Sequence, residues 1–441
     1  MLSSCNQRSV ISLTTGASRR QIALERDTAW LSSADAASLV MGMVVHVILT
    51  RSLLSGEYGL WVLLLDMFHV AFVLIDLGLP TIIGRDLDRL GNLGQKLVHR
   101  SLALQIPAMV VLIPAATLLS LRLTNAASVW LTPAILLAGS AALQVLAYSH
   151  RSALRALGEA RKEAVVRIID RAGVAVGLVI AHTYLPGRLD VLAIAVLAGP
   201  VLALLYAAFV GERQMLLSAS EQAQDLPTGS MEGKELLSAG LPFMLASGAL
   251  IIQVRIEKIL LGTIGDVEAL ASYQIAWLAF IAGYAPILSL RAMLLSHFGE
   301  VRTDITALLG RFERARKLVS LALIPSLLIG WFGGGMMIPL LFPAYSESAE
   351  PLFRILLAAW ALALIASPPL TIVQISNKPW RYTRALWWGI GADALACVVL
   401  IPRIGAEGAA WAACVGALVV LIIALLEAGR SAPSMREYSE E

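Results

Sequence analysis

Twelve apolar segments, each about as long as a membrane-spanning helix, follow one another along the 441 residues of this chain. A helix needs roughly 20 apolar residues to cross the hydrocarbon layer of a bilayer. Hydrophobic residues make up 58% of the chain and charged residues only 15%, which is unlike a soluble protein. The sequence therefore predicts an all-α polytopic membrane protein. The segments lie at 29–50, 59–83, 101–121, 127–150, 164–183, 190–211, 236–262, 270–290, 318–342, 352–375, 382–401 and 407–427.

Positive charges alternate between the gaps that separate these segments. Of the 34 Lys and Arg residues, 26 lie in the N-terminal tail and in every second gap after it, 5 lie in the other gaps and 3 lie inside segments. Cytoplasmic loops retain Lys and Arg, so this alternation indicates the orientation of the chain. We expect twelve transmembrane helices with both termini in the cytoplasm. The excess of Arg over Lys is typical of a GC-rich bacterium, so we expect the bacterial inner membrane.

A polar stretch with Pro227 and Gly229 forms the longest internal gap and divides the chain into two halves of six segments. We predict five regions, in chain order. They are a cytoplasmic N-terminal tail at 1–28, a first six-helix half at 29–211, a cytoplasmic linker at 212–235, a second six-helix half at 236–427 and a cytoplasmic C-terminal tail at 428–441.

The two halves show traces of an internal repeat. A shift of 216 residues superimposes 162–186 on 378–402, matching Lys with Lys and Pro with Pro at the two ends, and the same shift superimposes Gly173 on Gly389. Because each half contains an even number of helices, both halves begin on the same side of the membrane. The repeat is therefore predicted to be parallel, with a pseudo-two-fold axis along the membrane normal, as in transporters that move one half against the other.

Several classes of function are excluded by what the sequence lacks. The three cysteines, Cys5, Cys397 and Cys414, have no metal-binding spacing, and no ATP-binding or hydrolase motif is present. We therefore expect no metal, no cofactor and no enzymatic activity. The positive charges follow the topology, so the net charge of +3 does not indicate nucleic acid. The predicted external loops are short, which argues against a membrane enzyme with its chemistry in a large external loop.

Several motifs resemble one transporter family in their order and spacing. They are RSLLSGEYGLW at 51–61, IDLGL at 75–79 followed by Arg85, GLP at 240–242, RIEKILLG at 255–262, LFPAY at 341–345 and PRIGAEGAA at 402–410. Together they are similar to the polysaccharide-transporter flippases, the Wzx-type members of the MOP superfamily. That superfamily also contains the MATE exporters and the lipid II flippase MurJ. One position departs from the pattern, since the acid in the fourth motif is usually Asp and is here Glu257.

The resemblance implies a MATE-like fold and a flippase that works by alternating access. Its substrate would be a polyprenyl-diphosphate-linked oligosaccharide, moved from the inner to the outer leaflet for O-antigen, capsule or exopolysaccharide synthesis. The lipid bilayer, and a polysaccharide polymerase or assembly complex, are the partners it implies. Three alternatives stay open: a MATE-like drug or cation antiporter, a membrane enzyme of polysaccharide assembly, and a scaffold that transports nothing. An antiporter would favour an acidic, aromatic cavity over a cationic one.

Charged residues inside the membrane are expensive and usually face a protein interior or a wet cavity. The second segment carries Asp66, His69 and Asp76, which share one face if the helix is continuous. Such a stripe can pass protons, because imidazole titrates near neutral pH. The stripe therefore predicts ion coupling. The competing interpretation is that these groups satisfy one another or the backbone of neighbouring helices, and that Asp76 belongs to a packing motif with Gly78.

The seventh segment carries Arg255, Glu257 and Lys258, and Arg51 is their counterpart at the end of the first segment. Three cations that converge on a cavity suit a diphosphate, so Arg51, Arg255 and Lys258 are predicted to bind substrate. Glu257 is a further candidate for ion coupling. In the competing interpretation Arg51 and Lys258 reach the outer interface, and Glu257 only neutralises Arg255.

Three further sets of intramembrane charges are weaker candidates. Asp393 is a lone acid in the eleventh segment, and Asp170 and Arg171 are adjacent and are expected to form a local pair. Asp35 and His46 share a face of the first segment, where Asp35 lies close to the inner surface.

Overall fold

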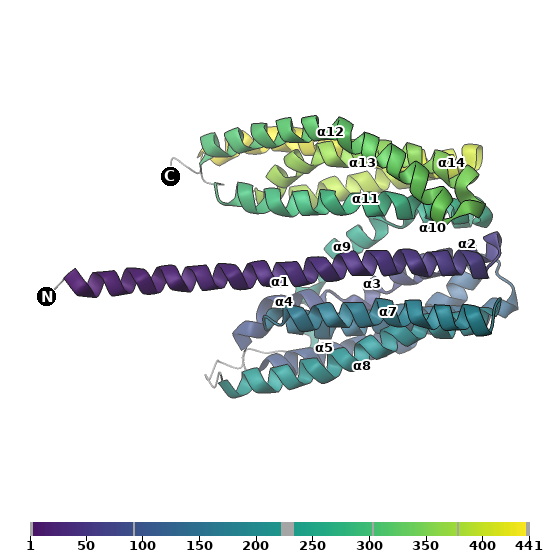
Figure 1. Ribbon diagram of the computed structural model, residues 1–441, viewed down its shortest axis with the longest axis horizontal. Helices are drawn as coiled ribbons and strands as arrows, with labels where there is room; N and C mark the ends of the chain where they lie inside the picture. The colour runs from purple at the N-terminus through teal and green to yellow at the C-terminus, as the bar shows by residue number, and fades with distance from the viewer. Residues whose placement is uncertain (1–2, 91–92, 222–232, 302–303, 377–378, 438–441) are drawn as a thin grey trace. The chain divides into compact units, whose positions relative to one another are not determined.

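The computed structural model describes residues 3–90, 93–221, 233–301, 304–376 and 379–437, and every element in this range is a helix (Figure 1). The first long helices are α1 (Ser3–Ser52), α2 (Ser55–Ala71), α5 (Gly94–Leu123), α6 (Leu131–Ala156), α7 (Ala160–Tyr184) and α8 (Leu189–Glu221). The later ones are α9 (Gly233–Gln253), α10 (Ile256–Ile264), α11 (Val267–Gly299), α12 (Ile305–Leu341), α13 (Ser346–Ile375) and α14 (Pro379–Glu437). Shorter elements are α3 (Val73–Asp76), α4 (Leu79–Leu90), η2 (Ser128–Trp130) and η3 (Pro343–Tyr345).

Ten helices of the described residues are long and apolar enough to cross a membrane. The protein is therefore an all-helical, multi-pass membrane protein. α7 is not among the ten, since Arg167, Asp170 and Arg171 lie in its first half. α14 counts once, although Ile404 and Gly405 have non-helical backbone angles and divide it into two helices at a kink.

The ends of the predicted regions are partly helical. α1 begins at Ser3 and runs through the predicted N-terminal tail, and α8 and α9 extend into the predicted linker from both sides. Pro227 and Gly229 of that linker, Lys378 of the repeat and the last four residues of the C-terminal tail lie outside the described residues.

The second and seventh predicted spans are broken helices. In the second predicted span, helix α2 ends at Ala71 and the short helix α3 follows. Leu77, directly after α3, adopts a left-handed conformation with φ 53°. The prediction that Asp66, His69 and Asp76 share one face of a continuous helix is therefore wrong. A close approach explains the turn, because a Cβ on Gly78 would lie 2.1 Å from the carbonyl oxygen of Gly240. The seventh span is divided between α9 and α10.

The chain forms two compact units. The first contains residues 1–48, 71–118 and 127–245, and the second contains residues 49–70, 119–126 and 246–441. In the first unit, buried apolar side chains of α4 pack with those of α5, α6, α8 and α9 around Leu79 and Ile83. In the second unit, α13 packs on both α11 and α14, and Leu370 lies in the shared core with Ala385 and Val420. α2, which the sequence places in the first half, belongs to the second unit.

In each unit, a pair of glycines lets two helical segments cross closely. In the first unit a Cβ on Gly173 of α7 would lie 2.8 Å from the Cα of Gly199 in α8. In the second unit a Cβ on Gly416 would lie 3.1 Å from the carbonyl oxygen of Gly389, across the kink of α14. Small residues let helix backbones approach closely in membranes. The match between Gly173 and Gly389 expected from the repeat therefore corresponds to the same packing device in both units.

The α7–α8 crossing predicts a large effect of one methyl group. We expect Gly199→Ala to lower the stability by about 1–3 kcal/mol, because its Cβ would lie 2.3 Å from the carbonyl oxygen of Asp170 and the backbone would have to move. The matched control is Gly391→Ala in α14, where nothing lies within 4 Å of the added atom. Thermal unfolding in detergent would compare the two. An unchanged unfolding temperature for Gly199→Ala would contradict this account of the crossing.

Candidate functional site

A buried charge cluster joins α2 to the start of α10 within the second unit. Asp66 on α2 is 7% exposed, and its carboxylate forms ion pairs with two cationic side chains. One Asp66 carboxylate oxygen lies 2.7 Å from Nζ of Lys258, and the other lies 3.2 Å from Nε of Arg255. Asp66 is therefore an ion-pair partner of two of the residues predicted to bind substrate, rather than a group that faces only His69.

The helix break positions both cations. Arg255 lies between α9 and α10 with φ −132°, so its side chain leaves the chain at a point where the helical repeat is interrupted. Lys258 follows in the first turn of α10, and it lies 5.7 Å from the centre of the Trp277 ring on α11. A lysine within about 6 Å of an aromatic face is attracted to the ring. Carboxylate and ring together account for the burial of this ammonium group.

Arg255 and Lys258 differ in how accessible they are. The Lys258 side chain is 7% exposed and the Arg255 side chain is 22% exposed. The Arg255 side chain is therefore the more accessible of the two, and its Nη1 donates to the carbonyl oxygen of Ile251 at 3.4 Å. Arg51, the third predicted cation, is exposed in the last turn of α1 and is not among the ion-pair partners found for Asp66 in the described chain. The three cations therefore do not form one buried group.

Glu257 belongs to a second buried pair. Its carboxyl group lies within hydrogen-bonding reach of the carboxyl group of Asp393 on α14, and the two residues are 3% and 4% exposed. Two carboxyl groups hydrogen-bond to each other only when one of them carries a proton. The thiol of Cys397 lies 3.6 Å from Asp393 Oδ1. The structure thus unites Glu257 with Asp393, an acid that the sequence showed only as isolated.

The Glu257–Asp393 pair lies on the wall of a cavity of about 330 Å³ within the second unit. Helices α9, α10, α11, α13 and α14 all contribute to this wall. Four of the lining residues are polar or charged: Gln253, Glu257, Arg291 and Asp393. Four are aromatic: Trp277, Phe280, Tyr284 and Tyr382.

Arg291 is held at the cavity wall by α13. Its Nε donates to Oγ of Ser367 at 3.2 Å, and its Nη2 donates to the carbonyl oxygen of Ala363 at 3.4 Å. In the sequence, Arg291 is one of the positive charges that indicate topology, and nothing marks it as part of a site. Trp277, Phe280 and Tyr284 recur at helical spacing, a signal of one shared face that was not used for the site prediction.

His69 and Asp76 have local backbone partners. Nδ1 of His69 lies 2.6 Å from the carbonyl oxygen of Leu65, one turn earlier in α2. In the first unit the Asp76 carboxylate accepts from the backbone N–H of Gly78 at 3.1 Å, as the competing interpretation of a packing motif expects. The Asp76 carbonyl oxygen accepts from Nε2 of Gln105 at 3.3 Å. The role of His69 and Asp76 in ion coupling stays a prediction.

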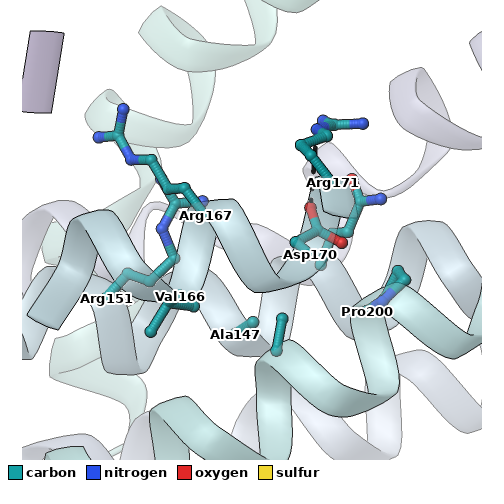
Figure 2. A pocket seen from close by; sticks show the side chains of 9 residues that line it. Ala147, Arg151, Val166, Arg167, Asp170, Arg171 and Pro200 are labelled. Atoms are coloured by element: carbon teal, nitrogen blue, oxygen red, sulfur yellow. Dashed lines mark ion pairs between the residues drawn. The ribbon is translucent and has the colours of Figure 1, made fainter. Parts of the chain in front are cut away.

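The first unit has a charge cluster of its own, shown in Figure 2. Arg151, Arg167, Asp170 and Arg171 line a small cavity of about 50 Å³ between α6, α7 and α8. In Figure 2 a dashed line joins Arg171 and Asp170, whose closest charged atoms are 3.7 Å apart, so the expected local pair is confirmed.

The acid at the centre of this cluster is Glu163, which is fully buried at the start of α7. It pairs with Arg155 at 2.6 Å, with Arg167 at 2.9 Å and with Arg151 at 3.5 Å. Arg167 also reaches Asp35 of α1. These arginines, predicted only as topological charges, hold α1, α6 and α7 together.

The comparison with protein families decides the identity of the chain at family level. The model of the family described as "Polysaccharide biosynthesis protein" matches residues 24–293. The chain belongs to this family. No curated protein is significantly similar to it in sequence.

Solved structures of MOP-superfamily transporters share the fold of this polysaccharide biosynthesis protein. An inward-facing multidrug resistance transporter of the MATE family has a TM-score of 0.72 at 15% identity, with 91% of this chain and 96% of that chain covered. The lipid II flippase MurJ, in an inward closed conformation, has a TM-score of 0.73 at 12% identity, covering 93% and 90%. A MOP-superfamily transporter from Pyrococcus furiosus has a TM-score of 0.64 at 15% identity, covering 94% and 96%. The MATE-like fold expected from the sequence is confirmed.

The Asp66 cluster predicts that Asp66→Asn destabilises the protein. Removing one partner from a buried charge cluster leaves the other charges uncompensated, which costs about 3–5 kcal/mol. We expect a lower unfolding temperature and a lower yield of folded protein. Adding Lys258→Met to Asp66→Asn should recover part of the lost stability, since it removes the more deeply buried cation.

The matched control for Asp66→Asn is Glu350→Gln, which removes a partner of Arg354 from a much more exposed ion pair. Such pairs contribute about 0–1 kcal/mol, so this variant should unfold close to the wild type. Equal unfolding temperatures for Asp66→Asn and Glu350→Gln would show that the cluster does not stabilise the fold.

Proposed function

We propose that the protein is a flippase for a polyprenyl-diphosphate-linked oligosaccharide. The observation that carries the proposal is the match to the polysaccharide biosynthesis family over residues 24–293, in a chain with the fold of MOP-superfamily transporters. The likeness to the lipid II flippase MurJ supports a lipid-linked substrate. Transport of such a substrate for O-antigen, capsule or exopolysaccharide synthesis requires no bond to be made or broken, so the protein acts as a transporter rather than an enzyme.

The membrane arrangement follows from the charge pattern. Twelve helices cross the bacterial inner membrane, both termini are cytoplasmic, and two six-helix halves related by a parallel pseudo-two-fold axis alternate between inward- and outward-open states. The glycine crossings, one within each unit, support the repeat. A polysaccharide polymerase or assembly complex would accept the glycan on the outer side.

Arg255 is the residue best suited to the diphosphate. Its side chain is the more exposed of the two that share Asp66, and the planar fork of N–H donors of a guanidinium matches phosphate oxygens. A diphosphate can therefore approach Arg255 while Lys258 stays paired with Asp66. Arg51, exposed at the end of α1, is available for a first, weaker attraction of the headgroup.

Glu257 is the residue best suited to ion coupling. Its carboxyl group faces that of Asp393 at the wall of the cavity in the second unit, so uptake or release of a proton by this pair would change the charge of the wall. Asp66 is engaged with two cations, and Asp76 is not on the same helix as Asp66 and His69. The coupling role predicted for those three residues is therefore secondary to that of Glu257, whose longer side chain replaces the usual Asp.

The test is reconstitution into liposomes that contain a fluorescent polyprenyl-diphosphate oligosaccharide. We expect the inner-leaflet label to become accessible outside faster in the presence of the protein, and faster still under a pH gradient. Failure to move any of several glycans by correctly folded protein would overturn the proposal.

Glu257→Gln predicts a specific defect in this assay. It should lose the acceleration of flipping by the pH gradient, because an amide cannot take up or release a proton at neutral pH. The matched control is Glu347→Gln on an exposed position of α13, which should respond to the gradient like the wild type. A normal gradient response in Glu257→Gln would remove this residue from the coupling mechanism.

A MATE-like cation antiporter is the second candidate function. The cavity in the second unit favours it, because two acids and four aromatic residues lie in its wall. The same liposomes separate the two functions. Uptake or efflux of a fluorescent organic cation under a pH gradient, without flipping of the lipid-linked glycan, would establish the antiporter.

A further inference from the structure

The cavity of the second unit is sized for a compact ligand group. Its volume of about 330 Å³ lies near the lower end of the roughly 300–1,000 Å³ that is typical of small-molecule sites. A whole lipid-linked oligosaccharide exceeds this space, but a single cyclic group of the glycan does not.

One side of the cavity is aromatic. Trp277, Phe280 and Tyr284 follow one another along α11, with ring centres 4.8 Å and then 5.5 Å apart. Tyr382 contributes a fourth ring from α14. Large flat apolar surfaces of this kind favour a ligand that is itself flat and carries C–H groups on its face. A sugar ring has such a face and carries its hydroxyl groups around the edge.

The hydrogen-bonding groups of the wall match those hydroxyl groups. A hydroxyl both donates and accepts, so it needs acceptors and donors around it. Glu257 and Asp393 supply carboxyl oxygens, Arg291 supplies N–H donors and Gln253 supplies both. Oε2 of Glu257 is buried and has no hydrogen-bond partner among the described residues, although buried polar atoms are normally satisfied. A hydroxyl in the cavity would satisfy it.

The charge of the wall favours a neutral ligand over a cation. Glu257 and Asp393 place two carboxyl groups on the wall and Arg291 places a guanidinium there, so the wall holds groups of both signs. In addition, the Lys258 ammonium already lies against the Trp277 ring and would repel a second cation there. The wall of the cavity therefore combines aromatic rings, hydrogen-bond donors and acceptors, and charged groups of both signs.

We propose that this cavity binds a neutral sugar ring, stacked on the aromatic face of α11 and hydrogen-bonded to Glu257, Asp393, Gln253 and Arg291. In assigning the ring to a lipid-linked glycan, the inference rests on the proposed flippase function. The second unit would then select the sugar, while Arg255 attracts the diphosphate. Sugar recognition and proton exchange would meet at Glu257.

Saturation-transfer NMR on the full chain in lipid nanodiscs tests the proposal. The probes are neutral monosaccharides (hexoses, 6-deoxyhexoses and N-acetylhexosamines) and, for comparison, tetraphenylphosphonium. We expect transfer to the ring C–H protons of at least one sugar. Tyr284→Ala should weaken its binding by roughly tenfold. Tyr184→Ala, at an exposed tyrosine in the first unit, should leave it unchanged.

Gln253→Leu is a second variant that tests the polar side of the cavity without removing an aromatic residue from the core. It should weaken sugar binding while retaining the unfolding temperature of the wild type. If no neutral sugar receives saturation, or if binding is insensitive to both Tyr284→Ala and Gln253→Leu, the proposal is wrong. Binding of tetraphenylphosphonium in place of sugars would overturn it in favour of a cation site.

The outcome is separable from that of the flipping assay. Flipping in liposomes without sugar binding in the cavity would leave the flippase intact and overturn only the sugar site. Sugar binding that depends on Tyr284, without flipping of any lipid-linked glycan, would support the sugar site and overturn the flippase.

Discussion

The requirement that charges buried in hydrocarbon be paired organises the second unit. Asp66 forms ion pairs with Arg255 and Lys258. These ion pairs connect α2 to the segment where α9 ends and α10 begins. An unpaired charge buried inside a protein costs several kcal/mol, so each of these buried groups depends on its partners. The broken helix is part of the same arrangement, because it places Arg255 beside Asp66 while Lys258 continues toward the Trp277 ring.

The neighbouring residue faces a different environment. Glu257 lies between Arg255 and Lys258 in sequence, yet it reaches Asp393 and the cavity instead of Asp66. Adjacent positions of α10 therefore separate two tasks. One side of the helix holds a closed ion-pair cluster that stabilises the fold, and the other presents a protonatable group to a space in which a ligand can bind. A proton at Glu257 can change without breaking the Asp66 cluster.

The lining of the cavity has features expected of a flippase and features expected of an antiporter. A cationic cavity was expected for a diphosphate and an acidic, aromatic one for an organic cation. The wall in the second unit has two acids and aromatic rings, but it also carries the guanidinium of Arg291. That mixture of groups suits the uncharged part of a glycan. The cation predicted for the headgroup, Arg255, belongs to the adjoining cluster rather than to the cavity wall.

The sequence by itself determined the helical, multi-pass architecture and the membership in the polysaccharide biosynthesis family, because hydrophobic length, loop charge and motif order are local properties of the chain. It also indicated Gly173 and Gly389 as equivalent positions. Only the tertiary structure decided the partners. Asp66 and Lys258 are 192 positions apart, and Glu257 and Asp393 are 136 apart, so no local pattern could pair them. The prediction of one continuous stripe from Asp66 to Asp76 was wrong for a related reason. Helix α2 ends at Ala71, and the chain then turns at Gly78, where the backbone of α9 approaches closely.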